Sequence, residues 1–181
     1  KPEVRSTENW FFKLSAFQSF LEEWIGENKF PPNVKNYALE WLREGLKDWC
    51  ITRDMSWGIP VPIEGVSDKV VYVWFDAPIG YISSSMEWAE LRGNDGEWRD
   101  FWQEETSRII HFIGKDIIYH HAIFWPAMLK AHGEYRLPFK IIAGEYLTLE
   151  GKKMSKSREW MVEVKEYLKK FEPDPLRYFL I

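Results

Sequence analysis

The chain has 181 residues, of which 45% are hydrophobic and 29% charged, as in an ordinary globular protein. Its formal net charge of −4 excludes a global basic field, so any contact with a polyanion must come from a local patch. The single cysteine, Cys50, excludes an internal disulfide and a cysteine-based zinc cluster, and it favours a reducing, cytoplasmic location. No apolar run approaches the roughly 20 residues that span a bilayer, so we expect no membrane association.

Two short helices are predicted in the first third of the chain. Ser15 is the expected N-cap of the first helix, because apolar residues follow over residues 17–25 at the spacing of one helix face. Pro31 and Pro32 begin the second helix, which extends to about Leu42. Residues 48–62 are expected to be irregular and extended. This part of the chain has a structural character, that of a helical hairpin packed on another element.

Residues 69–75 form the strongest strand prediction of the middle third, because they are β-branched or aromatic and turn residues flank them. Helices are expected over residues 83–91 and 98–104. The last third alternates strand 108–114, helix 116–131, strand 139–147, a basic loop at 151–158 and helix 161–171, with a final helical start at 176–181. The continuous apolar character of residues 108–114 predicts a strand buried on both faces. This alternation predicts parallel pairing in an α/β protein, with ligand sites at the carboxyl ends of strands.

The basic loop begins at Gly151 and contains four cations, Lys152, Lys153, Lys156 and Arg158. Lysine ammonium groups on a flexible loop are suited to the phosphate oxygens of a polyphosphate. The alternative interpretation is a solvated, lysine-rich turn.

Gly114 and Asp116 lie where a predicted strand ends and a helix begins. A glycine there permits close approach of the backbone to a ligand, and the Asp116 carboxylate can accept hydrogen bonds from a ribose diol. Alternatively, Asp116 is only a helix N-cap. His120 and His121 follow, but adjacent helical residues point about 100° apart, so no metal site is expected.

Four segments together resemble the methionyl-tRNA synthetases of class I. KMSKS at residues 153–157 matches the signature of class I aminoacyl-tRNA synthetases. WFDAPIGY at residues 74–81 and GKDIIYHH at residues 114–121 resemble segments of the methionine family, and WGIPVP at residues 57–62 resembles the segment before them. The order and spacing of these segments agree with the family over essentially the whole chain.

The resemblance implies a methionine pocket. Its residues would be Trp74, Ala77, Pro78, Tyr81, Ile117 and His121. An apolar aromatic pocket is suited to a thioether, because sulfur packs favourably against aromatic rings. Tyr81 and His121 would address the sulfur. For any single aromatic residue, burial in the core is the competing interpretation, and for Trp125 packing is the favoured one.

The resemblance also implies an ATP site, with ATP and Mg²⁺ as substrate and no resident metal in this chain. Gly114 and Asp116 would hold the ribose, and Lys153 and Lys156 would be the catalytic residues that meet the β- and γ-phosphates. Ser155 and Ser157 would donate hydrogen bonds or shape the loop. Residues 142–147 would bracket the adenine through backbone groups.

Parts of the family pattern are absent from these 181 residues. No HIGH-type His/Gly motif, zinc knuckle or helical anticodon-binding domain is present. We therefore expect an internal fragment, with the end of the connective insertion at 1–69 and the C-terminal half of the Rossmann-type catalytic domain at 70–181. The family's zinc would lie in the missing connective region. The isolated fragment is expected to be inactive and to self-associate through an exposed half-sheet.

Two other functions compete with methionine–tRNA ligation, whose partners would be methionine, ATP and tRNA(Met). One is a different class I synthetase of the leucine, isoleucine and valine group, whose pocket would prefer a branched aliphatic side chain. The other is a non-catalytic synthetase-like module that binds nucleotide or RNA. Retention of both Lys153 and Lys156 favours the enzyme over this module.

Overall fold

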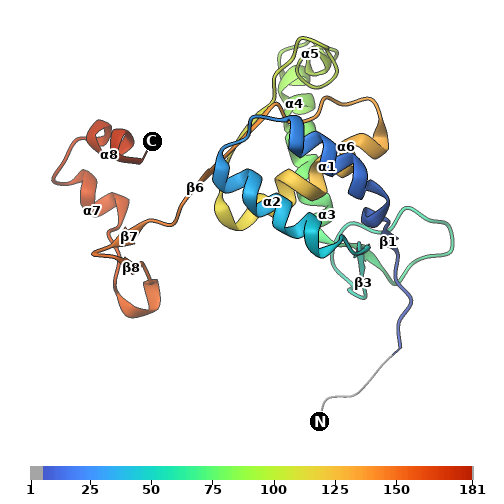
Figure 1. Ribbon diagram of the computed structural model, residues 1–181, viewed down its shortest axis with the longest axis horizontal. Coiled ribbons are helices and arrows are strands. Elements are labelled where there is room, and N and C mark those ends of the chain that lie inside the picture. The colour runs from blue at the N-terminus through green and yellow to red at the C-terminus, as the bar shows by residue number, and fades with distance from the viewer. Residues whose placement is uncertain (1–5, 181) are drawn as a thin grey trace. The chain divides into compact units, whose positions relative to one another are not determined.

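The computed structural model describes residues 6–180, so residues 1–5 of the predicted insertion segment and Ile181 of the predicted last helix lie outside the described residues. The chain divides into two compact units, of which the first ends at Gly144 and the second begins at Glu145 (Figure 1). No helix in the described part of the chain is both long enough and apolar enough to cross a membrane. The boundary predicted near residue 69 stays a prediction.

The first unit contains the predicted helical hairpin. A short 3-10 turn, η1 (Leu14–Phe17), leads into α1 (Gln18–Glu27), and α2 (Pro32–Glu44) follows. The two helices pack against each other, as the blue and light blue ribbons in Figure 1 show. The N-cap prediction was wrong, because Ser15 lies inside the 3-10 turn and its hydroxyl donates to Asp48 Oδ1 at 2.6 Å.

The first unit also contains two short antiparallel ribbons, whose first strand precedes the hairpin and whose other strands follow it. β1 (Phe11–Phe12) pairs with β2 (Trp49–Cys50), and β3 (Thr52–Arg53) pairs with β4 (Val70–Val71). β2 and β3 have only two residues each, which agrees with the prediction that residues 48–62 are irregular and extended. The strand predicted over residues 69–75 is shorter than expected. It ends at Val71, and it pairs with β3 in antiparallel orientation.

The residues after β4 are helical, which corrects the second half of that strand prediction. α3 (Val73–Asp76), η2 (Ala77–Ile79) and α4 (Gly80–Leu91) follow without a break. The turn begins where the N–H groups of Phe75 and Asp76 donate to the Tyr72 carbonyl, at 2.8 and 3.3 Å. Tertiary packing overrides β-propensity here, because the helical turn brings Phe75 against Phe124, with ring centroids 5.7 Å apart.

A parallel strand pair forms the centre of the first unit. After α5 (Trp98–Trp102), β5 (Ile110–Gly114) pairs in parallel with β6 (Lys140–Gly144), and Gly114 and Gly144 are partners at the carboxyl ends. This confirms the predicted strand–helix–strand unit of an α/β protein. The prediction that the first of these strands is buried on both faces was wrong for β5, since His111 is buried whereas Phe112 is 76% exposed.

The connection between the two strands is not one regular helix, as predicted for 116–131. It consists of η3 (Lys115–Ile117), a π-helical segment (His120–Phe124) and α6 (Trp125–His132). Pro126 accounts for the irregularity, because a proline has no N–H to donate and its ring clashes with the carbonyl four residues earlier, that of Ala122. The helix is therefore widened just before Pro126.

Two clusters of buried side chains form the core. The larger one joins the hairpin to the strand pair and the π-helical segment, with Leu21, Val34, Phe124 and Ile141 among its members. The second cluster contains Trp98, Trp102 and Trp125 with their neighbours. Trp125 is 2% exposed, which agrees with its predicted role in packing.

The second unit contains the basic loop. β7 (Thr148–Leu149) and β8 (Lys152–Lys153) form an antiparallel hairpin, and η5 (Lys156–Arg158), α7 (Val164–Leu168) and α8 (Pro173–Leu180) follow. The helix predicted over 161–171 is shorter. Ser155 and Trp160 exchange backbone hydrogen bonds at 2.9 and 3.1 Å, so the chain is still completing a turn at residue 160. The strand predicted to continue to 147 ends at Gly144.

Candidate functional site

One small cavity in the first unit unites all six residues predicted for methionine. Its volume is about 150 Å³. The lining residues are Trp74, Ala77, Pro78, Tyr81, Ile117, His120 and His121. The cavity is smaller than sites for drug-sized ligands, which measure roughly 300–1,000 Å³, and its size is appropriate to a single apolar side chain.

The helical course of residues 73–81 explains why one half of the cavity wall forms. Positions 74, 77, 78 and 81 are spaced as neighbours on one helix face, whereas a strand would point them alternately to opposite sides. The other half of the wall follows the carboxyl end of β5, where ligands bind in parallel α/β folds.

Tyr81 and His121 form a hydrogen-bonded pair at the cavity. The Tyr81 hydroxyl lies 2.9 Å from Nε2 of His121, and Nδ1 of the same ring lies 2.9 Å from the carbonyl oxygen of Ile117. A carbonyl can only accept, so Nδ1 carries the proton. In the neutral ring Nε2 is then the acceptor, and the Tyr81 O–H donates to it.

The electrostatic environment keeps this pair uncharged at neutral pH. Burial lowers the pKa of His121, although the hydrogen bond to the Ile117 carbonyl opposes the shift. Burial also raises the pKa of the Tyr81 phenol. The pair therefore presents neutral polar groups to a largely apolar cavity.

Two histidines near the cavity were not among the predicted site residues. His120 lines the cavity, and its ring lies 5.1 Å from that of Trp74. Relative to Ile117, the two adjacent histidines stand at the i+3 and i+4 positions of one helix face, so both reach the cavity. His111 lies behind Tyr81 and His121, with its ring 5.0 and 5.1 Å from theirs. A lone histidine inside an apolar strand was the only signal for it in the sequence.

Gly114 and Asp116, predicted for the ribose, lie at the carboxyl end of β5. Gly114 has φ −81° and, among the described residues, an added Cβ would meet nothing within 4 Å, so neither conformation nor packing requires a glycine. Gly114 occupies the N-cap position of η3, whereas Asp116 is exposed in its first turn. The alternative interpretation of Asp116 as the N-cap was therefore wrong.

The four cations of the basic loop are exposed. Lys153 Nζ lies 5.1 Å from the ring centroid of Tyr146, and Lys152 Nζ lies 5.6 Å from that of Trp160. The hydroxyls of Ser155 and Ser157 are 3.1 Å apart.

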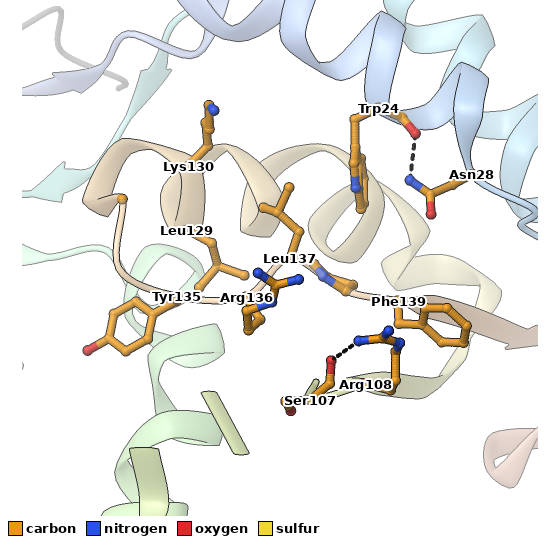
Figure 2. Close-up of a pocket in the computed structure, with 12 residues that line it drawn as sticks. Trp24, Asn28, Ser107, Arg108, Leu129, Lys130, Tyr135, Arg136, Leu137 and Phe139 are labelled. Carbon is orange, nitrogen blue, oxygen red and sulfur yellow. Dashed lines mark hydrogen bonds between the residues drawn. The ribbon is translucent and has the colours of Figure 1, made fainter. Parts of the chain in front are cut away.

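A larger cavity, of about 500 Å³, lies at the opposite ends of the two parallel strands (Figure 2). It is lined by Ser107 and Arg108, which precede β5, and by residues 135–139, which precede β6. The Arg108 guanidinium donates to the Ser107 carbonyl at 2.9 Å, as the dashed line shows. None of the predicted site residues lines this cavity. In the described part of the chain, no group of three or more His, Cys, Asp or Glu could hold a metal ion.

The parallel strand pair, its helical connection and the cavity at the carboxyl end of β5 define an α/β protein of the Rossmann type. All 181 residues match the family described as "tRNA synthetases class I (M)", and the chain belongs to this family. The methionine type is thereby favoured over the leucine, isoleucine and valine group.

Individual relatives agree with this assignment. The chain is 58% identical to the methionine–tRNA ligase of Methanopyrus kandleri and 52% identical to that of Methanobrevibacter smithii, over 100% and 99% of its length. It covers 27% and 26% of those proteins, so it spans about a quarter of the relatives that it matches. The Mycobacterium tuberculosis methionyl-tRNA synthetase in complex with methionyl-adenylate is similar in structure, with a TM-score of 0.79 and 35% identity over 96% of this chain and 33% of that one.

Proposed function

We propose that this chain is part of a methionine–tRNA ligase, in which the first unit binds the methionine side chain and the second supplies cations for the phosphates of ATP. The observation that supports this most strongly is the single cavity formed by Trp74, Tyr81, His121 and their neighbours. The methionyl-adenylate bound to the M. tuberculosis relative is consistent with it.

The proposed ligand of the cavity is the thioether of methionine. A flexible, polarizable side chain packs well between the Trp74 ring and the apolar groups of Pro78 and Ile117. Tyr81 and His121 add the polar groups of the wall. A charged side chain is disfavoured there, because the wall offers no opposite charge to offset its desolvation.

The proposed reaction is attack of the methionine carboxylate on the α-phosphate of ATP. A bond forms between a carboxylate oxygen and the α-phosphorus, the bond to the bridging oxygen of the β-phosphate breaks, and pyrophosphate leaves with that oxygen. Lys153 and Lys156 stabilise the charge that develops on the leaving phosphates, with Mg²⁺ bound to the ATP. Ser155 and Ser157 donate hydrogen bonds or shape the loop. Methionyl-adenylate is then the product of the first step.

The ribose of ATP is proposed to lie against Gly114, with the Asp116 carboxylate accepting from its hydroxyls. The empty space around Gly114 supports this, since a ligand can approach the backbone there. Residues 142–147 are proposed to contact the adenine through backbone groups.

The proposed partner of the second step is tRNA(Met), which accepts the methionyl group from the adenylate. This part of the proposal rests on the family alone. A cytoplasmic location is proposed with it, supported by the single, unpaired Cys50.

Methionine-dependent ATP–pyrophosphate exchange, measured on the full-length protein, tests the proposed function. We expect exchange with methionine and at most about 1% of that rate with leucine or valine, which lack the thioether and differ in shape. Equal exchange with leucine would reassign the enzyme to the branched-chain group. Binding of ATP or RNA without any exchange would favour the non-catalytic module.

The 181-residue chain on its own is proposed to lack exchange activity and to self-associate. It contains no HIGH-type motif, and Ile110 and Phe112 of β5 are 45% and 76% exposed. Sedimentation of the isolated chain at high concentration tests the second point, and a monomer there would contradict it.

A further inference from the structure

His111 is buried at a point where its polarity has no visible use. It belongs to β5, is 6% exposed and pairs in register with the fully buried Ile141. Among the described residues, its Nε2 atom is buried and has no hydrogen-bond partner. An unsatisfied buried polar atom costs about 1–3 kcal/mol, so an apolar residue would make a more stable strand at this position.

The ring of His111 contacts both members of the hydrogen-bonded pair at the cavity. Its centroid lies 5.0 Å from that of Tyr81, with the planes at 50°, and 5.1 Å from that of His121 in an edge contact at 62°. These separations are typical of favourable packing between rings. His111 does not line the cavity itself.

The three rings come from three separate elements. Tyr81 lies in α4, His121 in the π-helical segment and His111 in β5. The Tyr81–His121 bond joins the first two elements, and the bond from His121 Nδ1 to the Ile117 carbonyl holds the imidazole at a second point, but these two bonds alone do not fix the tilt of the Tyr81 ring. The third ring packs against both and restricts that tilt, because a core side chain is confined by its contacts.

We propose that His111 is a positioning residue for methionine recognition, whose ring packs behind Tyr81 and His121 and fixes their hydrogen-bonded orientation at the cavity wall. This inference rests on the proposed function of the cavity. A neutral ring is suited to the task, and burial, with the nearby His121 as a smaller cause, lowers the pKa of His111 to about 4. What matters for positioning is then the ring and not the charge.

The test measures exchange kinetics of the full-length protein with His111→Ala, His111→Phe and the matched control Ile141→Ala. The control truncates the buried register partner of His111 on the neighbouring strand, and Ile141 does not line the cavity. For His111→Ala we expect the KM for methionine to rise about tenfold, with kcat and the KM for ATP within about twofold of the wild type. His111→Phe should restore most of the loss, because it replaces the ring.

Discrimination against norleucine, in which a methylene replaces the sulfur, gives a second readout. The ratio of kcat/KM for methionine over norleucine should fall about fivefold in His111→Ala and stay unchanged in Ile141→Ala. A residue that only stabilises the fold would change the melting temperature in both variants without changing this ratio.

If His111→Ala does not fold, His111→Leu serves instead, since it fills the core without a ring. Equal effects of His111→Ala and Ile141→Ala, or no effect of His111→Ala on the KM for methionine, would overturn the inference while leaving the proposed function intact. Absence of methionine-dependent exchange in the wild type would overturn both.

Discussion

The cavity of the first unit and the basic loop of the second differ in what holds their side chains. Tyr81 and His121 are joined by a hydrogen bond of 2.9 Å, and the ring of His111 packs against both. Lys153 and Lys156 are exposed; Lys153 ends β8, and the turn that contains Lys156 is closed by the backbone bonds between Ser155 and Trp160. Selection of an uncharged side chain depends on a fixed surface, because small differences in packing must be detected. Neutralising phosphate charge depends more on reach, which a flexible lysine provides.

The largest effect is expected from the loop. Replacing Lys156 by alanine should lower kcat for exchange by about 100- to 1,000-fold, the usual cost of losing one group that stabilises developing charge. The KM for methionine should change little, because the cavity is intact, and thermal stability should be unaffected, because Lys156 is exposed. Steady-state exchange kinetics of the full-length protein provide the measurement.

Lys152→Ala is the matched control for this prediction. It removes a neighbouring exposed cation of the same loop, and kcat should stay within about threefold of the wild type. An equal loss of kcat in both variants would mean that the loop acts through its total charge and not through the position of one lysine. The loop would then differ even more from the cavity, where individual side chains are held in place.

The second effect concerns the cavity side and depends on pH. The folded-state pKa of His111 is lowered to about 4, whereas an unfolded histidine titrates near 6.5. The unfolded chain therefore binds a proton that the folded chain does not, so this contribution to stability is fully present above pH 6.5 and is lost as the pH falls toward 4. Between pH 7 and 5 the loss from His111 amounts to about 2 kcal/mol.

His111→Phe should remove this part of the pH dependence, because phenylalanine does not titrate. Urea unfolding of the full-length protein at several pH values checks the prediction, with a smaller loss of stability expected in the variant between pH 7 and 5. Identical slopes in the two proteins would show that His111 is not a buried neutral group.

Tyr81→Phe should raise the KM for methionine by about tenfold, because Nε2 of His121 loses its donor in a buried place. The KM for ATP should stay unchanged. Tyr119→Phe is a suitable control, since Tyr119 lies on the same helical connection as His121 but does not line the cavity. A response of the KM for ATP to Tyr81→Phe would show that the cavity does more than recognise a side chain.

The smallest effect is expected at Gly114. Among the described residues, nothing lies within 4 Å of a Cβ added at Gly114, so Gly114→Ala should change the free energy of unfolding by less than about 0.5 kcal/mol. If the ribose lies against this backbone, the added methyl group should raise the KM for ATP by about fivefold. Gly26→Ala is the control, because an added Cβ also meets nothing within 4 Å at Gly26. Unchanged kinetics in Gly114→Ala would contradict the ribose proposal.

Much of the fold could be predicted from local patterns. The hairpin of α1 and α2 follows from apolar residues at helical spacing, and the parallel pair follows from two apolar runs separated by a helix-length segment. Residues 73–76 could not be predicted this way. Their β-branched and aromatic character indicates a strand, and only the contacts that Phe75 makes with Phe12 and Phe124 after folding favour a helical turn.

In the candidate site too, some residues could be predicted from local sequence and others depend on tertiary packing. Its motif residues were predictable because their resemblance to a family is local in the sequence. His111 was not, because its contacts with Tyr81 and His121 exist only once three elements are packed together. The spacing of positions 74, 77, 78 and 81 was a helical signal, but it is too short to outweigh the composition of the segment.

Pro126 does not line the cavity, but it influences the geometry of the helical segment that forms part of the cavity wall. The proline is fully buried, and the π-helical segment ahead of it carries His120 and His121, which both line the cavity. An engineer who copied only the lining residues onto another helix would reproduce the chemical groups without their angles. Transplanting this site therefore requires the wide turn and its proline as one unit, and a sequence search for similar sites should include the proline five residues after the second histidine.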